Sequence, residues 1–273
     1  MLVGLDRVLD IAEKGGFAIP AFNVYNMETV MGIIEAAEQA QAPVILQSYS
    51  RLFTEGEAYY LAPVIKAAAE KASVPVAFHL DHGAGEREVT RAIRYGCTGI
   101  MIDCSTLELE QNIEGTKKIV DMCSHIGIAV EGELGHIGSV NDDKMSAYTD
   151  VEEAKTFVQK TGVGALAVMV GTAHGHYKQA PVLDIERIAD IKKATGIPLV
   201  LHGGSGVPDD QIKAAVAAGI RKINFGTDVC CSFLNKVFDT SRDIVAIDLF
   251  MKDAVQNIKK FGLEKIKLLG AKL

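Results

Sequence analysis

The stretch Val74-Pro75-Val76-Ala77-Phe78-His79-Leu80-Asp81-His82-Gly83 decides how the rest of the chain is interpreted. Its apolar run, bounded by proline and glycine, is too short for a helix and predicts a buried strand that ends in polar residues. In α/β folds the carboxyl ends of parallel strands carry the chemistry, because the loops that leave them converge on one face. Asp81 and His82 are adjacent and would diverge on a regular strand. We expect a turn at Gly83 and Gly85 to bring both side chains to one substrate.

The same pattern repeats along the chain. From Gly16 onward, short apolar runs alternate with longer segments of helical period, which is typical of βα units and a parallel sheet. There are about eight such units, which predicts an α/β fold of the TIM (β/α)8 barrel type. The expected strands are Phe17–Phe22, Val44–Gln47, Val76–Leu80, Gly99–Ile102, Ile128–Glu133, Ala165–Val170, Leu199–Leu201 and Ile220–Phe225. The expected helices between them are Glu28–Gln41, Glu57–Ala72, Glu86–Tyr95, Leu107–His125, Val151–Thr161, Asp184–Thr195 and Asp209–Ala218.

The tail after Asp228 shows helical periodicity alone, and we expect Gly262 to divide its late helices. These extra C-terminal helices would cap or extend the barrel. No low-complexity linker or shift in composition interrupts the chain, so we assign residues 1–273 to a single domain.

Composition limits the classes of partner. The 28 basic and 35 acidic residues give a net charge of -7, which argues against a nucleic-acid or anionic-membrane surface but leaves room for a local basic pocket. Five cysteines without a C-x-x-C pair indicate a reducing compartment. The first residues carry charge too early for a signal-peptide core, and no apolar run reaches membrane-spanning length. We therefore expect a cytoplasmic protein.

Polar residues gather at or just past the expected strand ends. Asp81 and His82 follow the third strand, Asp103 follows the fourth, and Glu131 and Glu133 close the fifth. His174 follows the sixth strand, His202 follows the seventh, and Asn224 lies at the end of the eighth. Imidazoles of His82, His174 and His202 could hold a divalent ion and leave positions open for substrate, as in catalytic zinc sites. Asp103 and Glu133 would supply oxygen ligands for a second metal position, or would hold the histidines through their other ring nitrogens.

A second signal indicates phosphate binding. His202-Gly203-Gly204-Ser205-Gly206 follows the seventh strand and leads into a helix start. Its glycines allow backbone N–H groups to approach an anion, and Ser205 adds a hydroxyl donor. Asn224-Phe225-Gly226-Thr227-Asp228 after the eighth strand offers further donors. Loops after strands seven and eight form the usual phosphate site of such barrels, so we expect a phosphorylated small molecule here.

Taken together, these motifs resemble the class II, metal-dependent ketose-bisphosphate aldolases, the family of fructose- and tagatose-bisphosphate aldolases. The similarity runs from about residue 15 to about residue 230 and includes the helical tail. Six motifs occur in the family's order: His79-Leu80-Asp81-His82, Met101-Ile102-Asp103, Glu131-Gly132-Glu133-Leu134-Gly135, Gly171-Thr172-Ala173-His174-Gly175, His202-Gly203-Gly204-Ser205-Gly206 and Asn224 through Asp228.

The resemblance implies a zinc-dependent aldol reaction that splits a ketose 1,6-bisphosphate into dihydroxyacetone phosphate and glyceraldehyde 3-phosphate. It implies that His82, His174 and His202 bind Zn²⁺, with Asp103 and Glu133 at a second metal position, and that Asp81 exchanges the proton of the hydroxyl beside the breaking bond. It also implies a homodimer or homotetramer, and Na⁺ or K⁺ in the phosphate pocket. The implied phosphate site consists of Gly175, Gly203, Gly204, Ser205, Asn224, Phe225, Gly226 and Thr227.

Three residues depart from the family pattern: Cys104 stands where a glycine is common, Gly226 where a larger residue is usual, and Asn141 where an acid is expected. Members carry a glutamate in the loop after the Glu-x-Glu-Leu-Gly motif, where it transfers a proton at carbon, whereas this chain has Asn141. An amide cannot transfer that proton, although Asp142 or Asp143 could if the loop is shifted. The alternatives are therefore an aldolase acting on an acidic or deoxy sugar phosphate, a non-catalytic sugar-phosphate-binding or partner subunit, and a barrel metallohydrolase. The phosphate loops count against the hydrolase. No lysine follows a strand end in a place suited to a Schiff base.

Overall fold

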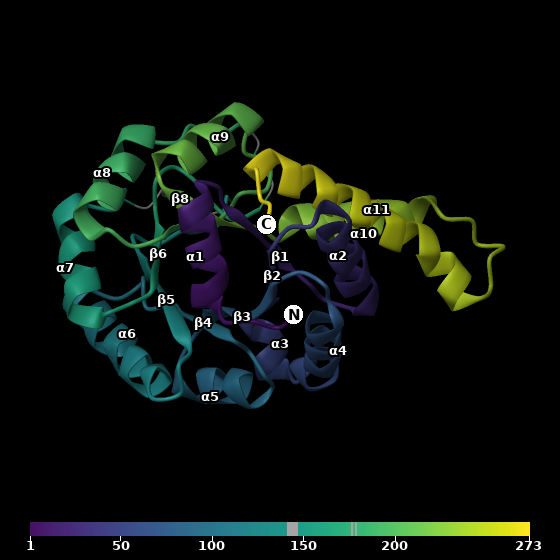
Figure 1. Cartoon of the computed structure of the whole chain (residues 1–273), viewed down its shortest axis with the longest axis horizontal. Coiled ribbons are helices and arrows are strands. Elements are labelled where there is room, and N and C mark those ends of the chain that lie inside the picture. Colours follow the sequence, from purple (N-terminus) through teal and green to yellow (C-terminus); the bar gives the residue numbers. More distant parts are fainter. Residues whose placement is uncertain (141–146, 176, 178) are drawn as a thin grey trace.

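The computed structural model describes the whole chain except residues 141–146, 176 and 178. Eight parallel strands close into a barrel in the order β1 to β8, and helices surround it (Figure 1). The prediction of a TIM barrel with extra C-terminal helices is confirmed. The strands are β1 (Ile19–Asn23), β2 (Val44–Tyr49), β3 (Val76–Gly83), β4 (Gly99–Ile102), β5 (Ala129–Leu134), β6 (Ala165–Val168), β7 (Leu199–Leu201) and β8 (Ile220–Phe225).

The seven helices expected between strands are present, with ends within two residues of their predicted positions. They are α2 (Met27–Ala40), α4 (Ala58–Lys71), α5 (Glu86–Arg94), α6 (Leu109–Ser124), α7 (Val151–Thr161), α8 (Ile185–Thr195) and α9 (Asp209–Ala218). A short helix that was not expected, α3 (Ser50–Glu55), follows β2 directly. It places the residues after Tyr49 at the carboxyl end of the barrel.

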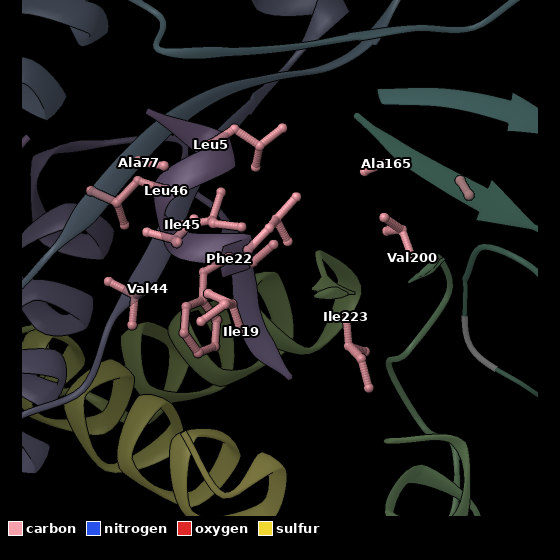
Figure 2. Packing of buried hydrophobic residues seen from close by; sticks show 14 of the residues in the cluster. Leu5, Ile19, Phe22, Val44, Ile45, Leu46, Ala77, Ala165, Val200 and Ile223 are labelled. Carbon is pink, nitrogen blue, oxygen red and sulfur yellow. The ribbon is translucent and has the colours of Figure 1, made fainter. Parts of the chain in front are cut away.

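The strands read as continuous apolar runs because both of their faces are buried. Outward-facing side chains pack under the helices: the Phe22 ring of β1 lies 5.9 Å from the Phe225 ring and 5.9 Å from the Phe261 ring. Figure 2 shows part of this apolar layer, with Ile19 and Phe22 beside the C-terminal helices. The barrel interior differs, because it holds fully buried polar side chains, including Gln47, His79, Glu131 and Lys222.

Helix α1 (Leu5–Gly15), which was not predicted, covers the amino-terminal opening of the barrel (Figure 1). The Leu5 amide donates to the Thr98 carbonyl just before β4, at 3.1 Å. The apolar residues Leu5, Val8 and Ala12 of α1 recur at helical spacing and are buried. The opposite, carboxyl-terminal opening therefore remains the open one.

The C-terminal tail forms α10 (Thr227–Asp239) and α11 (Ile247–Leu269), which pack together and project beyond the barrel (Figure 1). The expected break at Gly262 is wrong, because Gly262 lies inside α11. A Cβ there would lie 2.8 Å from the Ala36 Cβ of α2, so the glycine permits close contact between two helices. The tail instead breaks at residues 240–246. Within the described ranges, no helix is long and apolar enough to cross a membrane.

Candidate active site

The carboxyl-terminal opening contains a cavity of about 460 Å³. Most of the residues singled out from the sequence line it: Asp81, His82, Asp103, His174, Gly175, Gly203, Ser205, Asn224, Gly226 and Thr227. His202, Glu133, Gly204 and Phe225 lie buried behind this lining. Sequence reasoning missed further lining residues contributed by the ends of β1 and β2, namely Asn23, Tyr25, Tyr49 and Arg51.

The backbone of β3 changes direction at His82. We expected the turn at Gly83 and Gly85, but β3 continues to Gly83 and His82 itself adopts a left-handed φ of 53°. The register with β4 shifts between Leu80 and Gly83. A positive φ at a residue other than glycine costs about 1–3 kcal/mol and occurs where the surrounding structure enforces it. Its effect here is that the adjacent Asp81 and His82 both face the cavity, with Asp81 Oδ1 3.9 Å from His82 Nε2.

Three imidazoles from three strand ends converge beside this bend. The ring centroids of His82 and His202 are 4.8 Å apart, those of His82 and His174 are 5.1 Å apart, and those of His174 and His202 are 5.8 Å apart. One ring nitrogen from each lies within 4.8 Å of the others. The closest pair, His82 Nε2 and His202 Nδ1, is separated by 3.0 Å. This is the spacing of ligand atoms around one ion.

Carboxylates hold the far sides of two of these rings. His82 Nδ1 lies 2.8 Å from Asp103 Oδ2, and the other oxygen of Asp103 accepts from the Ser105 amide and hydroxyl. His202 Nε2 lies 2.9 Å from Glu131 Oε1. Each contact fixes the ring's orientation and tautomer and leaves the opposite nitrogen facing the other histidines. The contact between Asp103 and His82 is of the second kind predicted for Asp103, and its place at a second metal position stays a prediction.

The barrel interior supports Glu131 from below. Lys222 of β8 places its Nζ 2.8 Å from Glu131 Oε2, and both side chains are fully buried. Burial disfavours the charged carboxylate, but Lys222 and His202 hold the pKa of Glu131 well below its usual range. This lysine was missed because it lies within a strand and not after one. Its ion pair with Glu131 gives it a supporting position beneath His202.

The protonation states suit a metal. Burial and the neighbouring imidazoles lower the pKa of His174 to about 3, and burial also lowers the pKa of His202. Both are neutral at pH 7, as metal ligands must be. His174 Nε2 is buried and has no hydrogen-bond partner among the residues that the structure describes. Two neutral imidazoles, one of them with an unpartnered nitrogen, beside a third imidazole that can give up its proton to a metal, fit Zn²⁺.

Glu133 is fully buried, as is His202. One of its oxygens accepts from the Ile137 amide at 2.9 Å, and the other is 3.7 Å from His202 Nδ1. Burial and the charge of Asp103 raise the pKa of Glu133 to about 8. A ligand atom from each of His82, Asp103 and Glu133 also lies within 4.8 Å of the others, so this trio offers a second group of metal-ligand type.

Asp81 is held by a chain of amides. Asn23 Nδ2 donates to Asp81 Oδ2 at 2.7 Å, and Asn224 Nδ2 donates to Asp81 Oδ1 at 3.2 Å. Gln47 in turn donates to Asn23 Oδ1 at 2.9 Å. Although burial opposes ionisation, His82, His202 and Lys222 lower the pKa of Asp81. The result is an ionised carboxylate that two amides aim into the cavity.

The glycine-rich loops form the wall on the β7 and β8 side. Gly203 has a left-handed φ of 64°, and a Cβ there would lie 2.3 Å from the Ala173 carbonyl oxygen. The Gly204 amide donates to the Asn224 carbonyl at 3.1 Å and is therefore not available to a phosphate. The Phe225 ring packs against Phe22 in the apolar layer. Ser205 Oγ accepts from the Asp228 amide at 3.1 Å. Gly203, Ser205, Gly226 and Thr227 therefore remain as the lining of this wall.

The loop that begins at residue 138 is described up to residue 140 and again from residue 147. His174 exchanges backbone hydrogen bonds with this segment, donating to the Gly138 carbonyl at 2.8 Å and accepting from the Val140 amide at 2.9 Å. Asn141, Asp142 and Asp143 lie outside the described residues.

Comparisons with known proteins identify the family of the chain. The family model for class-II fructose-bisphosphate aldolase matches residues 3–272. The structure of the YdjI aldolase from Escherichia coli K12 is 35% identical, with a TM-score of 0.91, and the match covers 100% of this chain and 98% of that one. A candidate fructose-1,6-biphosphate aldolase from Coccidioides immitis is 29% identical with a TM-score of 0.89, over 97% of this chain and 95% of that one.

A third structure, the fructose-bisphosphate aldolase from Campylobacter jejuni, is 22% identical with a TM-score of 0.82, over 98% of this chain and 95% of that one, and supports the fold alone. The family model and the YdjI structure both match almost the whole chain, from the segment before α1 to the end of α11. On this ground the chain belongs to the class-II fructose-bisphosphate aldolase family and is an aldolase, a carbon–carbon lyase.

Proposed function

We propose that this aldolase uses Zn²⁺ to cleave and form a ketose 1,6-bisphosphate of the fructose or tagatose type, giving dihydroxyacetone phosphate and glyceraldehyde 3-phosphate. The observation that carries the proposal is the convergence of His82, His174 and His202 beside the ionised Asp81. Two of the three rings are held by carboxylates through their second nitrogens, which orients these two metal-ligand candidates.

The three histidines would hold the zinc ion, with Asp103 and Glu131 orienting His82 and His202. When bound, the ion supplies a Lewis acid that stabilises the negative charge developing on the ketone side as the carbon–carbon bond breaks. Asp81 accepts the proton of the hydroxyl on the carbon that leaves as the aldehyde. Asn23 and Asn224 keep its two oxygens in position for this transfer. In the synthetic direction Asp81 returns the proton.

The phosphate of the ketone half would bind at the wall after β7 and β8. Helix α10 begins at Thr227, so its first amides and positive dipole end face this wall. Ser205 and Thr227 add hydroxyl donors, and the lack of side chains at Gly175, Gly203 and Gly226 permits close approach. Asn224 lines the cavity beside this wall, and Gly204 and Phe225 would shape the wall from behind. Na⁺ or K⁺ would offset part of the phosphate charge.

We also propose that the chain is one domain that assembles into a homodimer or homotetramer in the cytoplasm. The projecting pair of helices α10 and α11 supports the assembly, because Phe238, Val245 and Ile247 near its tip are 77%, 87% and 75% exposed. Exposed apolar residues in a group of this kind are typical of contact surfaces. Sedimentation velocity would give the assembly size, and a monomer at micromolar concentration would contradict this part of the proposal.

The test is release of triose phosphate in a coupled assay, with fructose and tagatose 1,6-bisphosphates as the two substrates. We expect release from at least one of them that is abolished by a chelator and restored by Zn²⁺. Release that is unaffected by chelation would contradict the metal assignment. Failure with both bisphosphates, while dihydroxyacetone phosphate still condenses with other aldehydes, would contradict the substrate assignment.

A further inference from the structure

We propose that Arg51 binds the terminal anionic group of the aldehyde half of the substrate, a phosphate or a carboxylate, and thereby selects charged aldehydes over neutral ones. The inference rests on the proposed function, because the positions of Asp81 and of the three histidines set the direction in which the aldehyde half must extend.

The cavity has one wall suited to each half of the substrate. The ketone half is assigned to the loops after β7 and β8. Asp81 of β3 takes the proton of the hydroxyl on the carbon that becomes the aldehyde, so the rest of that half continues past Asp81. Tyr49 of β2 is the register partner of Asp81 on the neighbouring strand. The aldehyde half therefore extends toward the carboxyl end of β2.

Arg51 stands at this end, two residues after Tyr49, in the first turn of α3. It lines the same cavity as Asp81 and the histidines. Its guanidinium carbon lies 5.9 Å from the centre of the Tyr49 ring, and that ring lies 5.7 Å from the His82 ring. These contacts form a continuous path from the metal-ligand cluster to the guanidinium group.

The charge of Arg51 is available to a ligand. Among the described residues that line the cavity, Arg51 is the one lysine or arginine. Within the described part of the chain it makes no ion pair, whereas Arg187 and Arg221 are paired with Asp184 and Glu13. A guanidinium group beside an aromatic ring keeps its planar fork of donors free, and that fork matches a phosphate or a carboxylate bidentately. Arg51 is also exposed, so replacing it should not unfold the protein.

The experiment measures condensation of dihydroxyacetone phosphate with matched aldehydes in the zinc-loaded enzyme. One pair is glyceraldehyde 3-phosphate and glyceraldehyde, and the other is succinic semialdehyde and butanal. The variants are Arg51→Met and Arg51→Lys, with Arg94→Met as the control, since Arg94 is an exposed arginine in the last turn of α5.

We expect Arg51→Met to lower kcat/KM for the anionic members by about 10- to 100-fold, mainly through KM, while the neutral members change less than about 2-fold. For the anionic aldehydes, kcat/KM of Arg51→Lys should lie between those of the wild type and Arg51→Met, because lysine keeps the positive charge but lacks the planar pair of donors. Arg94→Met should match the wild type. If Arg51→Met loses the preference for glyceraldehyde 3-phosphate over glyceraldehyde, the bound anion is a phosphate. If it loses the preference for succinic semialdehyde over butanal, the bound anion is a carboxylate.

Equal losses on charged and neutral aldehydes in Arg51→Met would overturn the inference, and so would a wild type that uses both members of each pair equally well while cleaving a bisphosphate. A wild type that condenses none of the four aldehydes and cleaves no bisphosphate would contradict the proposed function, and the inference with it. The two failures are therefore distinguishable.

Discussion

On the metal-ligand side of the cavity, His82 and His202 are each held by a carboxylate, whereas on the β2 side Arg51 is exposed and lies against the Tyr49 ring. The first side is built from residues at or after strand ends, and carboxylates hold two of its three rings. The second is built from the first turn of a short helix. The difference separates two properties: the buried side determines the reaction, and the β2 side determines which aldehyde takes part in it.

Removing a histidine should have the largest effect, because it breaks the buried side. We expect His202→Ala to lower zinc content to background and kcat/KM by at least about 1,000-fold, since a bound Lewis acid supplies several kcal/mol of transition-state stabilisation. His82→Ala and His174→Ala should behave alike. His125→Ala, on the exposed surface of the protein, is the matched control. Elemental analysis and the coupled assay give both quantities, and full activity in a chelator-treated histidine variant would refute the ligand set.

Replacing Asp81 should separate metal binding from proton transfer. We expect Asp81→Ala to keep its zinc and to lose about 100- to 10,000-fold in kcat, the range of general acid–base catalysis. Asp81→Asn, which keeps the shape and removes the charge, should lose as much. Zinc content measured beside kcat checks this. A variant without metal would mean that Asp81 is a ligand and not the proton acceptor.

Loosening one supporting contact should have an intermediate effect. Asp103→Asn removes the carboxylate behind His82 Nδ1 and should weaken zinc binding by about 10- to 100-fold, as is usual for a group that holds a metal ligand. Competition with a fluorescent chelator measures the dissociation constant. Asp121→Asn, an exposed carboxylate on α6, is the control. An unchanged constant in Asp103→Asn would show that the contact does not support the ligand.

The smallest expected effect is the number of protons released when zinc binds. Burial works against a charged imidazole, but Asp81, Asp103 and Glu133 raise the pKa of His82 to about 9 in the metal-free protein. His82 therefore carries a proton at pH 7 that zinc must displace, whereas His174 and His202 are already neutral. We expect about one proton to be released per zinc bound, measured by calorimetry in buffers of different ionisation enthalpy. Release near three would show that all three imidazoles start out charged.

Much of the barrel was predictable because its strands are buried on both faces and consist mainly of apolar residues. The order of strands and the positions of Asp81, His82 and His174 at strand ends follow from that pattern. Helix α1 shows the same helical spacing of apolar residues, but the segment was considered only as a leader. The conformation of His82 could not be predicted, because a left-handed φ is favoured by glycine and Gly83 was the natural expectation.

The supporting contacts inside the barrel could not be read from the sequence. Lys222 lies within a strand, and its partner Glu131 comes from the opposite side of the barrel. Asn23 and Gln47 look like ordinary strand-end residues until closure of the barrel sets them in line with Asp81. Gly262 was misinterpreted for the same reason, since its contact with Ala36 is tertiary. The role of an acid near Asn141 stays a prediction.

The most direct test of the metal-ligand cluster is to measure zinc content and bisphosphate cleavage together on one preparation, before chelation, after chelation and after zinc is restored. We predict that cleavage falls to background with the metal and returns in proportion to the zinc rebound, in the wild type and not in His202→Ala. Cleavage that persists in metal-free protein would contradict a zinc-dependent aldolase built on His82, His174 and His202.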